Sequence, residues 1–194
     1  MVKELIPVPI ESKAPILSDP DFETFCEHLL DEGINYNKLP PDQVTVLSTL
    51  MSYVLHRSLD GELSISIHFR DGLELLPGLD LQLARSKAFL GHLHIGLHLL
   101  AQELIAGKLR DVEMIYGLAH LPEQWGRKHG FTTRPYIPKD PELLKRHYES
   151  IYGKTDKNPD ELPPLTFFSH RRETFIRKFY KEKLKDLNPT PVDN

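Results

Sequence analysis

Apolar side chains change their spacing several times along the chain, and each change predicts a change of secondary structure. Residues 1–17 hold three prolines and show no period, which predicts an extended arm. Apolar positions then recur three and four residues apart over 19–33 and again over 41–55. Both segments are therefore predicted to be helices with one apolar face.

Strict alternation of apolar and polar side chains over 63–69 predicts a half-buried strand. The mostly apolar run over 81–107 predicts a long, largely buried helix. Beyond it the two kinds of pattern alternate. Strands are predicted over 112–119, 131–137 and 165–168, and helices over 122–129, 140–152 and 169–187, the last with Ser169 as its N-cap.

This alternation predicts a single α/β domain over 18–187, with a mixed sheet of about four to six strands flanked by helices. The length of 194 residues suits one domain. Residues 188–194 follow the last predicted helix and are expected to form a frayed tail.

The composition argues against several classes of partner. The formal net charge is −4, so the chain has no basic field to recruit nucleic acid. No apolar run reaches the roughly 18 residues that a membrane-spanning helix needs, and the N-terminus carries no secretion signal. We therefore expect a cytoplasmic protein without a membrane span. The single cysteine, Cys26, falls within the apolar pattern of 19–33 and is predicted to be a buried, inert side chain.

Two of the ten histidines, His94 and His98, lie four residues apart on one face of the long predicted helix. A zinc-protease motif would require glutamate at position 95, where this chain has Ile95, and no third ligand is evident nearby. No metal site is expected. The two imidazoles are predicted to bind backbone groups or each other.

Two other histidines are candidate catalytic residues. His120 follows the strand over 112–119, at the carboxyl end where ligands gather in open α/β sheets, and could act as a general base; the alternative is a histidine that caps the strand or lies at the edge of the core. His68 shares the polar face of the strand over 63–69 with Ser66. That face is either exposed to solvent or covered by a helix, and in the second case His68 lines a cleft.

Five segments, taken in order, resemble the YkoP-like domain, a short bacterial protein that also occurs at the end of some polysaccharide deacetylases. They are Ile65-Ser-Ile-His-Phe69, Ala84-Arg-Ser-Lys-Ala88, Met114-Ile-Tyr-Gly-Leu118, Lys128-His-Gly-Phe-Thr132 and Leu165-Thr-Phe-Phe-Ser-His-Arg171. The resemblance covers residues 60–182 and departs from the family pattern at Asp71. It implies a module that binds a small molecule or a protein in cell-envelope polysaccharide or glycolipid metabolism, with no cofactor. Its candidate ligand contacts are Tyr116, Ser169 and Arg171.

The order strand, long helix, strand, short helix, Gly-Phe turn and strand also resembles the second half of GCN5-related acyltransferases (GNAT-like proteins). This resemblance implies acyl-CoA as cofactor and transfer of the acyl group to nitrogen or oxygen. The segment containing Arg85 is similar to the turn that holds the CoA pyrophosphate, although Ala88 and Leu90 replace two glycines. Trp125, a further candidate ligand contact, stands beside Gly126, where that family often has a tyrosine as general acid. Under this alternative, His120 or His68 would be the base.

Overall fold

The computed structural model describes residues 19–35, 38–40, 42–48, 51–57, 62–69, 83–107 and 109–180, and within these ranges every side chain except those of 19, 20, 69 and 83–90. The predicted arm over 1–17, residues 181–187 of the last predicted helix and the predicted tail over 188–194 lie outside the described residues.

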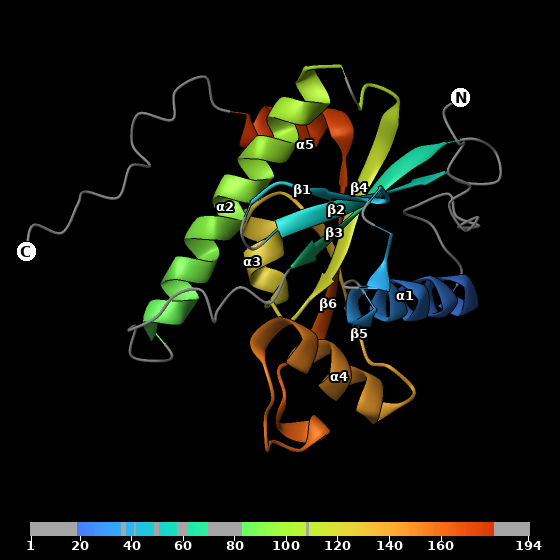
Figure 1. The fold of residues 1–194 in the computed structure, drawn as a ribbon, viewed down its shortest axis with the longest axis vertical. Coiled ribbons are helices and arrows are strands. Elements are labelled where there is room, and N and C mark those ends of the chain that lie inside the picture. Colours follow the sequence, from blue (N-terminus) through green and yellow to red (C-terminus); the bar gives the residue numbers. More distant parts are fainter. Residues whose placement is uncertain are drawn as a thin grey trace, which may run out of the picture.

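Six strands form one mixed sheet in the order β1-β2-β3-β4-β6-β5, with helices on both faces (Figure 1). This architecture confirms the predicted α/β class. The strands are β1 (Val44–Val46), β2 (Met51–Arg57), β3 (Leu63–Phe69), β4 (Val112–Ala119), β5 (Thr132–Tyr136) and β6 (Leu165–Arg171). The helices are α1 (Asp19–Ile34), α2 (Leu83–Ile105), α3 (Glu123–Lys128), α4 (Pro141–Tyr152), α5 (Arg172–Phe179) and the short 3₁₀ helix η3 (Pro159–Glu161).

The strands β3 and β4 are parallel, whereas every other pair of neighbours in this sheet is antiparallel. A parallel pair needs a long crossover because the chain must return to the end from which it started. Here α2 lies in that crossover. The order strand, long helix, strand, short helix and strand from β3 to β5 agrees with the order of elements predicted from the sequence. None of the described helices, α2 included, combines the length and apolar character needed to cross a membrane.

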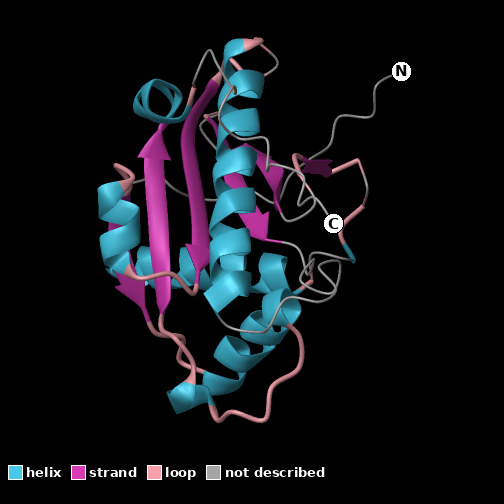
Figure 2. Ribbon diagram, turned by 90° about the vertical axis from the view of Figure 1, so that its left-hand side faces the viewer, coloured by secondary structure: helices cyan, strands magenta, loops and turns pink. Residues whose placement is uncertain are grey.

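The two faces of the sheet are covered by different helices. The helices α2 and α5 pack together over one face, and α1 and α4 lie on the other (Figures 1 and 2). Alternation along β4 sends Ile115 and Ala119 into the core under α2, and Tyr116 and Leu118 into the core under α1. Because burial of a large apolar side chain contributes roughly 1.5–3 kcal/mol, both cores hold the sheet in place.

The sheet face under α1 has an apolar half and a polar half. The apolar half lies over β4, β5 and β6, where Tyr116 and Phe167 pack against Phe22 and Phe25 of α1. Over β2 and β3, the side chains that share this face are mostly polar, and all of them are buried. The polar ones are Ser52, His56, Ser64, Ser66 and His68.

The predicted helix over 41–55 is wrong, because β1 and β2 occupy this part of the chain. The β-branched residues of β1, Val44 to Val46, favour extended backbone. The spacing of apolar residues was misleading because β2 buries such side chains on both faces of the sheet. Met51 and Tyr53 belong to the core under α2, while Val54 faces the other way.

The strand β6 extends three residues beyond its predicted end, so Ser169 lies inside a strand and is not the N-cap of α5. The ladder with β4 accounts for the extension, since its pairs run as far as Arg171 opposite Met114. The last helix is also shorter than the predicted 169–187, because α5 ends at Phe179 and its C-cap Tyr180 has extended backbone. The other predicted elements agree with the structure to within two residues at each end. At the two edges of the sheet lie the three-residue strand β1 and the strand β5, which contains Pro135.

Candidate functional site

The parallel strands β3 and β4 part before either of them ends. Their ladder stops at the pair Ile67 and Gly117, although β3 continues to Phe69 and β4 to Ala119. Beyond this point β4 remains paired with β6 as far as Ala119. The carboxyl ends of parallel strands are where open α/β sheets bind ligands. A ligand site is therefore expected at the point where β3 and β4 separate.

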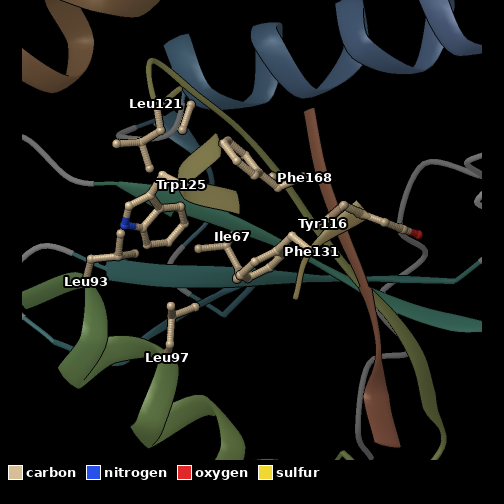
Figure 3. A pocket seen from close by; sticks show the side chains of 10 residues that line it. Ile67, Leu93, Leu97, Tyr116, Leu121, Trp125, Phe131 and Phe168 are labelled. Carbon is tan, nitrogen blue, oxygen red and sulfur yellow. The ribbon is translucent and has the colours of Figure 1, made fainter. Parts of the chain in front are cut away.

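A small apolar pocket lies at this separation, on the face covered by α2 (Figure 3). Its volume is about 30 Å³, room for one or two water-sized groups. The lining residues come from β3, α2, β4, α3, β6 and the segments between them. They are Ile67, Leu93, Leu97, Tyr116, Gly117, Ala119, Leu121, Trp125, Phe131 and Phe168.

Two aromatic residues predicted to contact a ligand, Trp125 and Tyr116, direct their side chains towards opposite faces of the sheet. The Trp125 ring packs beside Phe131 and Phe168, with ring centroids 6.1 and 6.0 Å away, and forms part of the pocket wall. The Tyr116 hydroxyl points away from this group (Figure 3), and its ring packs edge-on against Phe25 in the opposite core, at 5.1 Å between centroids. The Tyr116 side chain is therefore mainly a packing element.

On the opposite face, His68 is buried beneath α1, so the face that the sequence left open is covered by a helix. The His68 Nε2 atom lies 2.5 Å from Oε1 of Glu32, and the Ser66 hydroxyl donates to the same oxygen at 2.5 Å. The His56 Nε2 atom lies 2.7 Å from Ser66 Oγ and 3.3 Å from Glu32 Oε2. Glu32, His56, Ser66 and His68, here called the Glu32 cluster, are each less than 9% exposed.

Electrostatics keeps the Glu32 carboxyl ionised. Burial alone would raise its pKa, but hydrogen bonds and charge interactions with His56 and His68 outweigh that effect and hold the pKa well below its usual range. A buried carboxylate is stable only when it is paired in this way. Glu32 of α1 and the polar side chains of β2 and β3 therefore depend on each other, because each would be buried without a partner if the other were absent.

A second buried pair joins the end of β4 to α4. His120 Nδ1 lies 2.7 Å from the carbonyl oxygen of Pro163, and His147 Nδ1 lies 3.3 Å from His120 Nε2. A carbonyl only accepts, so Nδ1 of His120 carries the hydrogen and Nε2 holds the lone pair, to which His147 donates. Burial lowers the pKa of His120 to about 4, and burial together with His120 and His68 lowers that of His147. Both imidazoles are neutral at pH 7.

The two buried groups are neighbours. A methyl group placed on Gly33 of α1 would lie 3.1 Å from the His147 ring and 3.6 Å from His68 Nδ1. The structure thus places both predicted catalytic histidines in one buried row, with His147 between them. Sequence reasoning missed Glu32, His56 and His147, because their proximity depends on how α1 and α4 pack. The one readable signal was the acidic residue Glu32 close to the apolar positions of α1.

The other predicted site residues lie elsewhere. Ser169 is buried opposite Tyr116 in the β4–β6 ladder, and Arg171 is exposed at the end of β6; neither lines the pocket. Arg85 lies in α2 at a position whose side chain is outside the described part of the structure, so its role stays a prediction. His98 Nδ1 binds the carbonyl of Phe179 at 2.9 Å, as predicted for a backbone-bonded histidine.

No family model and no curated protein matches this chain. Solved structures of an acyltransferase share part of the fold. The complex with decanoyl-CoA and teicoplanin has 12% sequence identity and a TM-score of 0.38, covering 67% of this chain and 47% of that one. A mutant acyltransferase in complex with octanoyl-CoA has 11% identity and a TM-score of 0.37, covering 66% and 46%. The chain spans about half the length of these proteins, and a likeness of this size assigns neither a family nor an activity.

Proposed function

We propose that this protein transfers an acyl group from a CoA thioester to a nitrogen or oxygen nucleophile. The observation that carries the proposal is the separation of β3 from β4, with an apolar pocket on one side of the sheet and the neutral imidazole of His120 beyond the end of β4. The order of strands supports the same class of enzyme, because the parallel strands β3 and β4 are neighbours in the sheet and lie on either side of the separation.

The separation is suited to hold a thioester. Past Gly117, the backbone groups of β4 that face β3 have no partner in the β3–β4 ladder, so they can bind the thioester carbonyl. The pocket would take the acyl group itself. A volume of about 30 Å³ accommodates an acetyl group, whereas an octanoyl chain requires the pocket to open.

Of the two predicted bases, the structure favours His120. The Nε2 atom of His68 is engaged by Glu32, while Nε2 of His120 keeps its lone pair, to which His147 donates. The acceptor nucleophile would replace the His147 N–H group at this nitrogen and give up its proton there. As the new bond to the acyl carbon forms, the carbon–sulfur bond breaks, and the CoA thiolate leaves as the thiol with the proton that the His120 imidazolium gives back.

Calorimetry and thermal-shift measurements with acetyl-CoA, octanoyl-CoA and free CoA test the donor site. Acetyl-CoA should bind more tightly than octanoyl-CoA. Ala119→Leu fills the pocket and should weaken acetyl-CoA binding at least ~10-fold, because a side chain then occupies the acyl position. Ala106→Leu, the same substitution at an exposed position, is the matched control and should leave binding unchanged. No heat and no thermal shift with either acyl-CoA would overturn the proposal.

Turnover tests the base. Release of CoA thiol in the presence of a panel of amine and hydroxyl acceptors should fall about 10²–10⁴-fold in His120→Ala, while acetyl-CoA affinity changes little. Unchanged turnover in this variant would remove His120 from the mechanism.

The second candidate is a YkoP-like module that binds a small molecule or protein partner in envelope polysaccharide or glycolipid metabolism. It is favoured by one observation: the carboxylate and imidazoles of the Glu32 cluster are buried and bonded to one another. This candidate predicts that a ligand binds without release of CoA thiol. Neither the wild type nor His120→Ala should then catalyse acyl transfer.

A further inference from the structure

Three side chains on α1 and β2 are close enough to share a metal ion. The ligand atoms of His28, Glu32 and His56 lie within 4.8 Å of one another, and they form the one such group of three found among the described residues. We propose that this chain binds one divalent cation of the zinc class through these three side chains. The site is separate from the His94–His98 pair considered from the sequence, and it does not depend on acyl transfer.

The two oxygens of Glu32 have different surroundings, and this division favours a metal. Oε1 accepts hydrogen bonds from Ser66 and His68. Oε2 faces His56, 3.3 Å away. In metal sites a ligating carboxylate is typically fixed by hydrogen bonds to its second oxygen. Ser66 and His68 already supply that support, which leaves Oε2 to bind the ion.

The elements that carry the ligands suit this arrangement. His28 and Glu32 are four residues apart on α1 and therefore share one face of the helix. His56 comes from β2, a strand paired on both sides. Tetrahedral ligands at zinc distances are separated by ~3.4 Å, so ligand atoms that lie within 4.8 Å of one another must approach by at most ~1.4 Å. His28 can make this movement, because its ring is only partly buried.

The donor set indicates the kind of cation. Two imidazoles and one carboxylate suit zinc and neighbouring transition metals, whereas magnesium and calcium prefer oxygen ligands only. Three protein ligands leave a fourth position for water. His28, the most exposed of the three, lies where an ion from solvent would enter.

The competing arrangement is a metal-free cluster in which protonated histidines alone balance Glu32. Zinc chloride added to the full chain after removal of metals with EDTA distinguishes the two. We expect one zinc per chain by calorimetry and elemental analysis, and a visible absorption band when cobalt replaces zinc. His28→Gln, on the partly exposed face of α1, should keep the fold and weaken zinc binding more than ~100-fold, because loss even of outer-shell partners costs 10–100-fold.

Glu32→Gln and His56→Asn should weaken binding to a similar extent. His94→Gln is the matched control: it removes an imidazole that lies near His129, 4.8 Å away between ring centroids, on the other side of the sheet. It should leave the affinity for zinc unchanged. The proposal is overturned if the chain takes up no zinc at one equivalent, if His28→Gln binds zinc as well as the wild type, or if His94→Gln abolishes binding. Because the readout is metal uptake, failure here leaves the acyl-CoA experiments unaffected.

Discussion

Two glycines of α2 provide a matched test of how closely this helix packs on the sheet. A Cβ atom at Gly96 would lie 2.6 Å from Sδ and 2.9 Å from Cβ of Met51, a fully buried residue of β2. A Cβ atom at Gly91 would meet nothing within 4 Å. The same substitution, glycine to alanine, therefore meets opposite surroundings at two positions of one helix.

The expected free energies follow from these distances. Alanine in a helix interior is favoured over glycine by about 1 kcal/mol, and this gain applies at both positions. Gly91→Ala should therefore raise the free energy of unfolding by about 1 kcal/mol, or 2–4 °C in Tm for a chain of this size. At Gly96 the overlap with Met51 adds a packing cost of about 1–3 kcal/mol, because the Met51 Cβ atom can move only with the strand. Gly96→Ala should then be less stable than Gly91→Ala by that amount.

Urea denaturation followed by the fluorescence of Trp125, in the presence of EDTA, measures the difference. Relative to the wild type, the urea midpoint should rise in Gly91→Ala and fall in Gly96→Ala. If the packing cost at position 96 is at the lower end of its range, the midpoint of Gly96→Ala should still lie clearly below that of Gly91→Ala. A Gly96→Ala variant as stable as Gly91→Ala would show that α2 does not lie against β2 as described, and would remove this wall from the pocket.

Three further outcomes are expected. Burial amid the rings of His147, Tyr148 and Tyr152 lowers the pKa of His120 to about 4 in the folded state. The contribution of neutral His120 to the free energy of unfolding is therefore fully present above pH 6.5 and is lost as the pH falls from 6.5 towards 4. By linkage this amounts to about 3 kcal/mol, and urea midpoints should fall less steeply with acid in His120→Gln; parallel curves would contradict the buried neutral state. Burial raises the pKa of the Cys26 thiol to about 12, so this thiol should resist alkylation at pH 8 until urea unfolds the chain, and rapid reaction in the folded state would refute its burial. Phe175→Ala should cost about 3–5 kcal/mol, since this ring is fully buried against Phe131 and Phe179, and a loss below 1 kcal/mol by calorimetry would place α5 off the core.

The elements that could be predicted are those whose pattern is local. The helices α1 and α4 and the strand β3 each show one clear period, and α2 and β4 are recognised as long apolar runs. The strand β2 shows neither pattern, because it buries side chains on both faces of the sheet and so imitates a helix in its spacing of apolar residues. The prediction of a helix there removed His56 from consideration as a neighbour of His68.

The site was predictable only in part for a different reason. His68 and His120 stand at the ends of two strands, a position that can be inferred from the strand pattern. Their partners Glu32 and His147 are contributed by α1 and α4, and nothing local says which helix covers which half of the sheet. His147 precedes Ile151 by four residues on the buried face of α4. The burial of His147 could therefore be predicted from the sequence, whereas its contact with His120 could not.

The edges of the sheet have a consequence for how this protein meets others. At one edge, Pro135 in β5 has no N–H group to offer, so a peptide that tried to extend the sheet there would lose a hydrogen bond in the middle of the new ladder. At the other edge, β1 is three residues long and offers too short a template for stable addition. Both edge strands of the described sheet therefore disfavour the addition of a strand from another molecule, which lowers the tendency of the sheets of two molecules to join edge to edge.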